Sequence, residues 1–233
     1  MGVSRPAAVL TVAIMLLAQG RLGAANDLNH IAEIMAGANG DSRIQFIVVR
    51  QEGSGHQWGP QSGEAQSRAM LVFFDALGRE TGSFKFAADA PGPAASDVLI
   101  ATAEFAAVAG APAPNFTMPP LLNPISGAVC FQSNPLNNVS SRRNCVSYGS
   151  FTGITIGNSR NAAGPGPPAA SLPIVNTVSL RSIQAANVGT DLNTDFAITT
   201  TPTPRNHTGA AFTIPVASII TQGDNPVSYT HLT

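Results

Sequence analysis

The chain has 233 residues, of which 44% are hydrophobic and 11% are charged, and its formal net charge is -1. This hydrophobic content is enough for a folded core and argues against a disordered chain. Nucleic-acid-binding proteins carry a basic patch or stripe, and none is visible here, so we do not expect nucleic acid as a partner. The length corresponds to one domain, or to one domain with a fragment of another.

Residues 1–25 predict a signal peptide. Arg5 supplies a positive n-region, residues 7–18 form an apolar stretch, and residues 23–25 form a small-residue cleavage site. The apolar stretch is shorter than the roughly 20 residues of a membrane-spanning helix. We therefore expect a secreted, periplasmic or cell-surface protein with no transmembrane segment after cleavage. An uncleaved membrane anchor is the alternative.

Residues 26–206 read as short apolar runs separated by turns, because 22 Gly and 18 Pro are spread through the chain. This pattern is typical of an all-β sandwich with long Gly/Pro-rich loops. A Gly/Asn-rich turn is expected at residues 37–41, and a short helical turn at 103–108. The expected strands cover residues 30–35, 43–50, 70–75, 83–86, 97–102, 127–131, 145–149 and 177–181.

The second expected strand is apolar on both faces. Ile44, Phe46 and Val48 alternate with Ile47 and Val49. A strand with this pattern is expected to be covered on both sides.

The loop at residues 53–68 holds the one tryptophan of the chain, Trp58. With His56 and Gln57 it forms a candidate ligand contact, because an indole offers a large rigid face and a hydrogen-bond donor. The alternative is that Trp58 closes one end of the sandwich.

Cys130 and Cys145 flank a polar segment. In an exported chain an even number of cysteines favours a disulfide, here between neighbouring strands. A pair of reactive thiols or metal ligands is the alternative, although the chain has no C-x-x-C. Arg142 and Arg143 lie between the cysteines and form a second candidate ligand contact, for an anionic polymer. A solvated loop is the alternative, because two charges give little affinity.

No motif predicts catalysis. The four histidines are scattered, metal-ligand spacings are missing, and Ser54 and His56 do not form a G-x-S-x-G elbow. Asn39 and Asp41 supply too few oxygens for calcium, so turn chemistry explains them better. We therefore expect no catalytic residues, no metal and no cofactor, and we do not expect an enzyme.

The most specific pattern closes the expected domain. Its residues are Val178-Ser179-Leu180-Arg181, then Thr194-Asp195-Phe196, then Thr201-Pro202-Thr203-Pro204-Arg205-Asn206, and they follow an early Ile31-x-Glu33-Ile34 and Phe46-Ile47. In this order the chain resembles the lamin tail domain (LTD) family, in its bacterial exported form. The resemblance implies an immunoglobulin-like β-sandwich used as an accessory module. Gln45 and Val48 stand where that family usually has glutamates.

The resemblance and the leader together predict a non-catalytic exported binding or tethering module, whose partner is an unknown protein or a surface polymer. One alternative is an accessory domain of an exported redox (c-type haem) or hydrolytic enzyme whose catalytic part lies downstream. Another is a stand-alone carbohydrate or surface-polymer binder. Residues 207–233 read as a linker or the truncated start of a further domain. The abrupt end resembles adapter read-through, so whether the last residues are native stays open.

Overall fold

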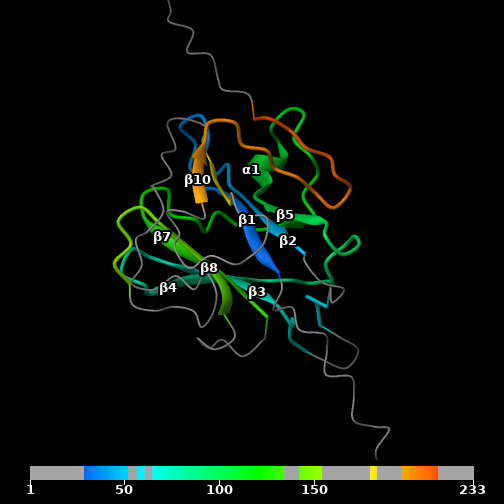
Figure 1. The fold of residues 1–233 in the computed structure, drawn as a ribbon, viewed down its shortest axis with the longest axis horizontal. Coiled ribbons are helices and arrows are strands. Elements are labelled where there is room, and N and C mark those ends of the chain that lie inside the picture. Colours follow the sequence, from blue (N-terminus) through cyan, green and yellow to red (C-terminus); the bar gives the residue numbers. More distant parts are fainter. Residues whose placement is uncertain are drawn as a thin grey trace, which may run out of the picture.

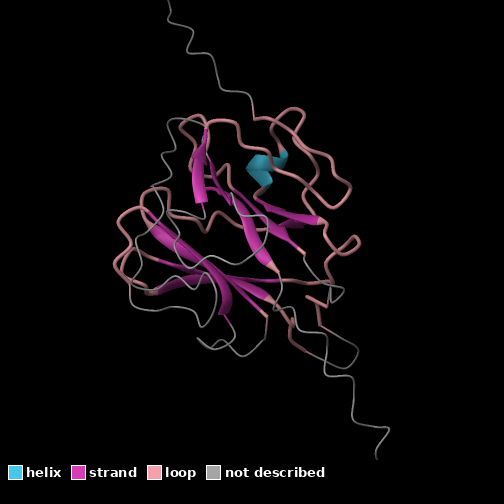
Figure 2. Cartoon of the chain, viewed as in Figure 1, coloured by secondary structure: helices cyan, strands magenta, loops and turns pink. Residues whose placement is uncertain are grey.

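The computed structural model describes residues 29–51, 57–60, 65–133, 142–153, 179–182 and 196–214. In these ranges the chain is nearly all β, with two sheets facing each other as a sandwich and one short helix beside them (Figures 1 and 2). The expected fold class, an all-β sandwich of immunoglobulin-like type, is confirmed. None of the described helical residues forms a span long and apolar enough to cross a membrane.

The larger sheet has six described strands in the order β10-β9-β1-β2-β5-β6. Neighbouring strands are antiparallel except for β5 and β6, which are parallel. Because β1 pairs with β9, the first and last parts of the described chain lie side by side. The bounds are β1 His30–Met35, β2 Phe46–Arg50, β5 Asp97–Ala101, β6 Phe116–Thr117, β9 Ser179–Ser182 and β10 Phe196–Thr199.

The smaller sheet has four described strands in the order β4-β3-β7-β8, all antiparallel. The β3–β4 hairpin expected from the sequence is present. Its turn depends on Gly78, which adopts a φ of 77° and donates its N–H to the Asp75 carbonyl at 3.1 Å. The Asp75 carboxylate accepts the amides of Leu77 and Arg79 at 2.9 Å each. The bounds are β3 Met70–Phe74, β4 Glu80–Lys85, β7 Gly127–Gln132 and β8 Arg142–Tyr148.

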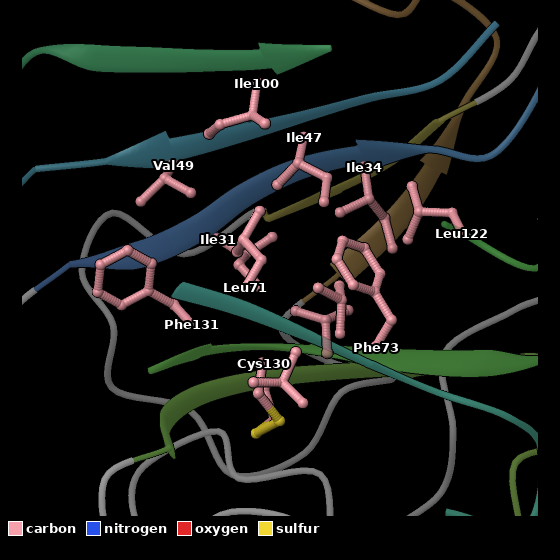
Figure 3. Close-up of a cluster of buried hydrophobic side chains, with 14 of the residues drawn as sticks. Ile31, Ile34, Ile47, Val49, Leu71, Phe73, Ile100, Leu122, Cys130 and Phe131 are labelled. Carbon is pink, nitrogen blue, oxygen red and sulfur yellow. A yellow bond between two sulfur atoms is a disulfide. The ribbon is translucent and has the colours of Figure 1, made fainter. Parts of the chain in front are cut away.

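The main core lies between the two sheets (Figure 3). Aliphatic side chains from β1, β2 and β5 face leucine and phenylalanine side chains from β3 and β7, and they are almost fully buried. The labelled members that meet there include Ile31, Ile34, Ile47, Val49, Ile100, Leu71, Phe73 and Phe131.

A second apolar cluster covers the other face of the larger sheet, which we call the outer face. Phe46 and Val48 of β2 belong to this cluster, whereas Ile47 and Val49 belong to the main core. The two-sided pattern of the second strand is therefore confirmed. The cover comes from helix α1, Ala103–Ala106, and from Phe212 and Ile214. Thr102 caps α1 by accepting the Phe105 amide.

The strand boundaries differ from the sequence prediction in places. β2 begins at Phe46 rather than at residue 43, because the Asp41 carboxylate accepts the Arg43 amide at 2.8 Å and holds that stretch in a turn. β8 starts earlier than expected, at Arg142, and its Asn144 faces the core. Asn144 Oδ1 accepts the Ile31 amide at 2.7 Å and so links the two sheets. Strands β6 and β10 were not predicted.

Candidate functional site

Several polar and charged side chains of the outer face are arranged around Glu33, which is fully buried. A bulge in β1 between Ile31 and Glu33 changes the register with β2. Glu33 then pairs with Val48, whose side chain lies on the outer face. Directly opposed residues of a sheet share a face, so the Glu33 carboxylate also points to the outer face.

The Glu33 carboxylate accepts hydrogen bonds from two distant parts of the chain. In β9, Ser179 Oγ donates at 2.5 Å, and the Arg181 guanidinium donates through Nε at 3.1 Å and Nη2 at 3.3 Å. From residues 201–206, the Thr203 amide donates at 3.0 Å. These donors compensate the desolvation of a buried charge, which would otherwise be costly.

A second carboxylate extends this arrangement along the outer face. Arg205 Nη1 lies 3.9 Å from Glu33, and its Nε donates to Asp97 at 2.8 Å. Arg50 Nη1 lies 3.4 Å from the other Asp97 oxygen. We call the five residues Arg181, Glu33, Arg205, Asp97 and Arg50 the arginine–carboxylate row. Cation and anion alternate along it, and it connects β9, β1, β5 and β2 with residues 201–206.

The row contains three charged residues of the patterns that carried the sequence resemblance. Glu33 belongs to the early Ile-x-Glu-Ile, Arg181 to Ser-Leu-Arg, and Arg205 to the closing Thr-Pro-x-Pro-Arg-Asn. In this protein these residues hold the domain together rather than presenting unpaired acids to solvent.

Gln45, which stands where a glutamate was expected by resemblance, also has a structural role. It is buried, its Nε2 donates to the carbonyls of Ser42 and Leu122 at 2.8 Å, and its Oε1 accepts the Leu122 amide at 2.9 Å. An amide can donate and accept at once, which a carboxylate cannot.

Trp58 lies inside the sandwich with no exposed surface. Its ring centroid is 4.6 Å from that of Phe86, 5.1 Å from Phe131 and 6.2 Å from Phe116. Because these phenylalanine rings surround the indole, neither of its faces is left for a ligand in this structure. Trp58 is therefore a residue of the main core.

The other candidate ligand contacts are described only in part. His56 lies outside the described residues, and Gln57 accepts a hydrogen bond from Arg68 Nη1 at 2.7 Å. Arg142 is buried, with its guanidinium 4.8 Å above the Phe74 ring and 3.6 Å from Glu80, and this burial lowers its pKa. Arg143 belongs to β8, but its side chain is outside the described part.

The disulfide between Cys130 and Cys145 is confirmed. The two residues face each other directly across β7 and β8, with 4.0 Å between their Cα atoms. Both are buried, on the side of the sheet opposite to Phe131. The bond joins strands that already pair.

The Gly/Asn-rich turn at residues 37–41 is also present. Asn39 and Gly40 adopt φ values of 52° and 81°, as turn chemistry predicts. The Asp41 carboxylate is held by Arg43, whose Nη2 lies 2.8 Å away. Among the described ranges no group of three or more His, Cys, Asp or Glu side chains is placed to hold a metal ion.

The arginine–carboxylate row is the signal that the sequence reasoning missed. The acids and arginines were visible, but their distances along the chain gave no reason to join them.

Comparison of the chain with protein-family models, with curated proteins and with solved structures found no match.

Proposed function

We propose that this chain is a non-catalytic binding or tethering module of lamin-tail type, exported by a bacterium and carried at the cell surface or in the periplasm. The observation that supports it best is the closure of the sandwich by the arginine–carboxylate row. Glu33 near the start of the described chain holds Arg181 and Thr203 near its end. Contacts within the domain thus join its early and late strands, and a module displayed on a surface needs such internal stability.

The disulfide supports the exported location. Disulfides form and persist in oxidising compartments and are rare in reducing ones. Cys130 and Cys145 form such a bond here. The reading as a carbohydrate binder that stacks sugars on Trp58 loses its main support, because that side chain is buried.

Export is tested by expressing residues 1–233 in a bacterial host with a C-terminal reporter enzyme that is active only in an oxidising compartment. We expect reporter activity outside the cytoplasm, and a mature N-terminus close to Ala25 in mass spectrometry. The matched control is the same fusion without residues 1–25, which should stay inactive. If residues 1–25 were still attached and the reporter enzyme were inactive, the result would contradict export.

Tethering is tested separately with purified mature protein and washed bacterial cell envelopes. We expect the protein to sediment with the envelopes, and a heat-unfolded sample to lose this association. Failure of the folded protein to sediment with any envelope fraction would contradict the tethering function.

A further inference from the structure

We propose that the outer face of the larger sheet binds an acidic polysaccharide, through a pair of arginines held on either side of Asp97. The proposal rests on the tethering function above and names the class of surface polymer to which the module would attach. The two arginines are Arg50 in β2 and Arg205 in the segment that crosses the sheet.

The two guanidinium groups share one carboxylate. Arg205 Nε donates to Asp97 Oδ2 at 2.8 Å, and Arg50 Nη1 lies 3.4 Å from Asp97 Oδ1. The Asp97 side chain is only 11% exposed, whereas those of Arg50 and Arg205 are 37% and 29% exposed. The carboxylate is thus shielded beneath two cations that still reach solvent.

Both arginines are positioned before any ligand arrives. Arg50 ends a central strand, and Arg205 Nη1 also donates to Thr203 Oγ1 at 3.0 Å. Side chains ordered in advance lose less conformational entropy on binding, so more of the contact energy becomes affinity.

Donors remain for a ligand. Within the described part of the chain, Arg50 forms its ion pair through Nη1, and Arg205 donates through Nε and Nη1. Arg50 Nε and Nη2 and Arg205 Nη2 make no hydrogen bond there. A guanidinium presents its N–H groups in a planar fork that matches a carboxylate or a sulfate.

The charge of the row also favours an anion. Three arginines and two carboxylates leave the row with one excess positive charge, whereas the whole chain has a formal net charge of -1. Arg43, by contrast, forms a one-to-one ion pair with Asp41. His30 lies opposite Arg50 in β1 and is a further titratable group on this face.

The surroundings favour a sugar polymer over a bare anion. Exposed hydroxyl chemistry lies next to the row: the Thr201 carbonyl accepts Arg181 Nη2 at 2.7 Å, and the hydroxyl of this exposed residue lies 3.1 Å from that of Thr199. Hydroxyls donate and accept hydrogen bonds, which suits the hydroxyl groups of a saccharide. A uronate or a sulfated sugar combines both chemistries in each repeat.

The test is native gel electrophoresis of the mature protein through gels that contain polygalacturonate, dextran sulfate or neutral dextran. We expect at least one acidic polymer to retard the protein, neutral dextran to have no effect, and added salt to reverse the retardation. Retardation by polygalacturonate identifies carboxylate as the recognised group, and retardation by dextran sulfate alone identifies sulfate.

Arg50→Gln is the diagnostic variant, and Arg43→Gln is its control. Each removes one arginine that reaches solvent, with the Arg50 side chain 37% exposed and that of Arg43 63% exposed, but only Arg50 belongs to the row. We expect Arg50→Gln to weaken retardation about fivefold, in keeping with the loss of one charge-assisted contact, and Arg43→Gln to leave it unchanged. Arg50→Gln should keep the thermal midpoint, because Asp97 remains paired with Arg205.

Absence of retardation at low salt, or equal loss in both variants, would overturn the proposal. If the protein sediments with cell envelopes but ignores both acidic polymers, the tethering function stands and the polysaccharide is wrong. If Arg50→Gln leaves envelope binding intact, the partner, such as an acidic protein, lies on another surface.

Discussion

The backbone amide of Thr203 donates to the Glu33 carboxylate at 3.0 Å, although the two residues are 170 positions apart in the sequence. This contact places the closing Thr-Pro segment over the first strand. It links the first strand to residues near the end of the described chain.

Replacing Glu33 by Gln should destabilise the domain by about 3 kcal/mol, because removal of one partner from a buried ion pair leaves the other charge uncompensated. Arg181 and Arg205 would lose their shared anion. Urea unfolding gives the free energy. Glu104→Gln, at a partly exposed acid of α1, is the control and should change stability by less than about 0.5 kcal/mol. Equal effects of the two changes would contradict the role of Glu33.

Replacing both cysteines by Ala should lower the free energy of unfolding by about 3 kcal/mol, the chain-entropy value for a loop of this size. The bridged residues are 15 apart in sequence. Thermal unfolding with and without reductant measures the effect, and reductant should not shift the double variant. Two free thiols in the unreduced native protein would refute the bond.

Gly149→Ala should destabilise the domain far more than Gly40→Ala. Both glycines have positive φ, 67° and 81°, so both variants carry the backbone strain, about 1–2 kcal/mol. Only at Gly149 would the new Cβ also meet another group, the Ile125 carbonyl oxygen at 2.2 Å, whereas nothing lies within 4 Å at Gly40. The difference between the two melting temperatures isolates the clash. Similar melting temperatures would show that the backbone at residue 149 can move away.

Trp58→Ala should cost about 3–5 kcal/mol, as expected for a large aromatic side chain removed from a core. Intrinsic fluorescence gives an independent check, since Trp58 is the one tryptophan of the chain and is fully buried. Its emission should be at short wavelength and resistant to soluble quenchers. Long-wavelength, quenchable emission from the folded protein would instead favour an exposed stacking platform.

The pKa of Asp41 is lowered to about 2, mainly by the hydrogen bond from the Arg43 side chain and then by that from its amide. A carboxyl whose pKa is lower in the folded state contributes stability that is present above its unfolded pKa of about 3.9. That contribution is lost as the pH falls through about 2. An NMR titration of the Asp41 carboxyl should show the low pKa, and Arg43→Gln should raise it toward its ordinary value. An unchanged pKa in Arg43→Gln would assign the shift to the turn backbone instead.

Much of the fold could be predicted because it depends on local patterns. Alternation in β1 and β2, and the Asp75–Gly78 turn of the β3–β4 hairpin, are encoded within a few residues. The disulfide was predictable from the even cysteine count in a chain expected to be exported. β6 was missed because two residues carry no periodicity, and β10 because its four residues include one buried and two exposed side chains.

The candidate site was less predictable. In the sequence, Trp58 has the features of a ligand contact, because it is a large aromatic residue in a polar loop. Only the packing of Phe86, Phe116 and Phe131 around it shows that it belongs to the core. Arg142 is similar, because it is buried beside Phe74 of β3, a strand distant from it in the sequence.

Composition and side-chain periodicity were sufficient to predict the all-β class, the two faces of β2 and the cysteine pair, because they report which face of an element is apolar. The pairing of the charged residues could be read only from the folded chain. Glu33, Asp97 and Arg205 are brought together by strand pairing over long stretches of chain and by one bulge in β1. Periodicity records a residue's face but not its partner, so the arginine–carboxylate row became visible only in the folded sheet.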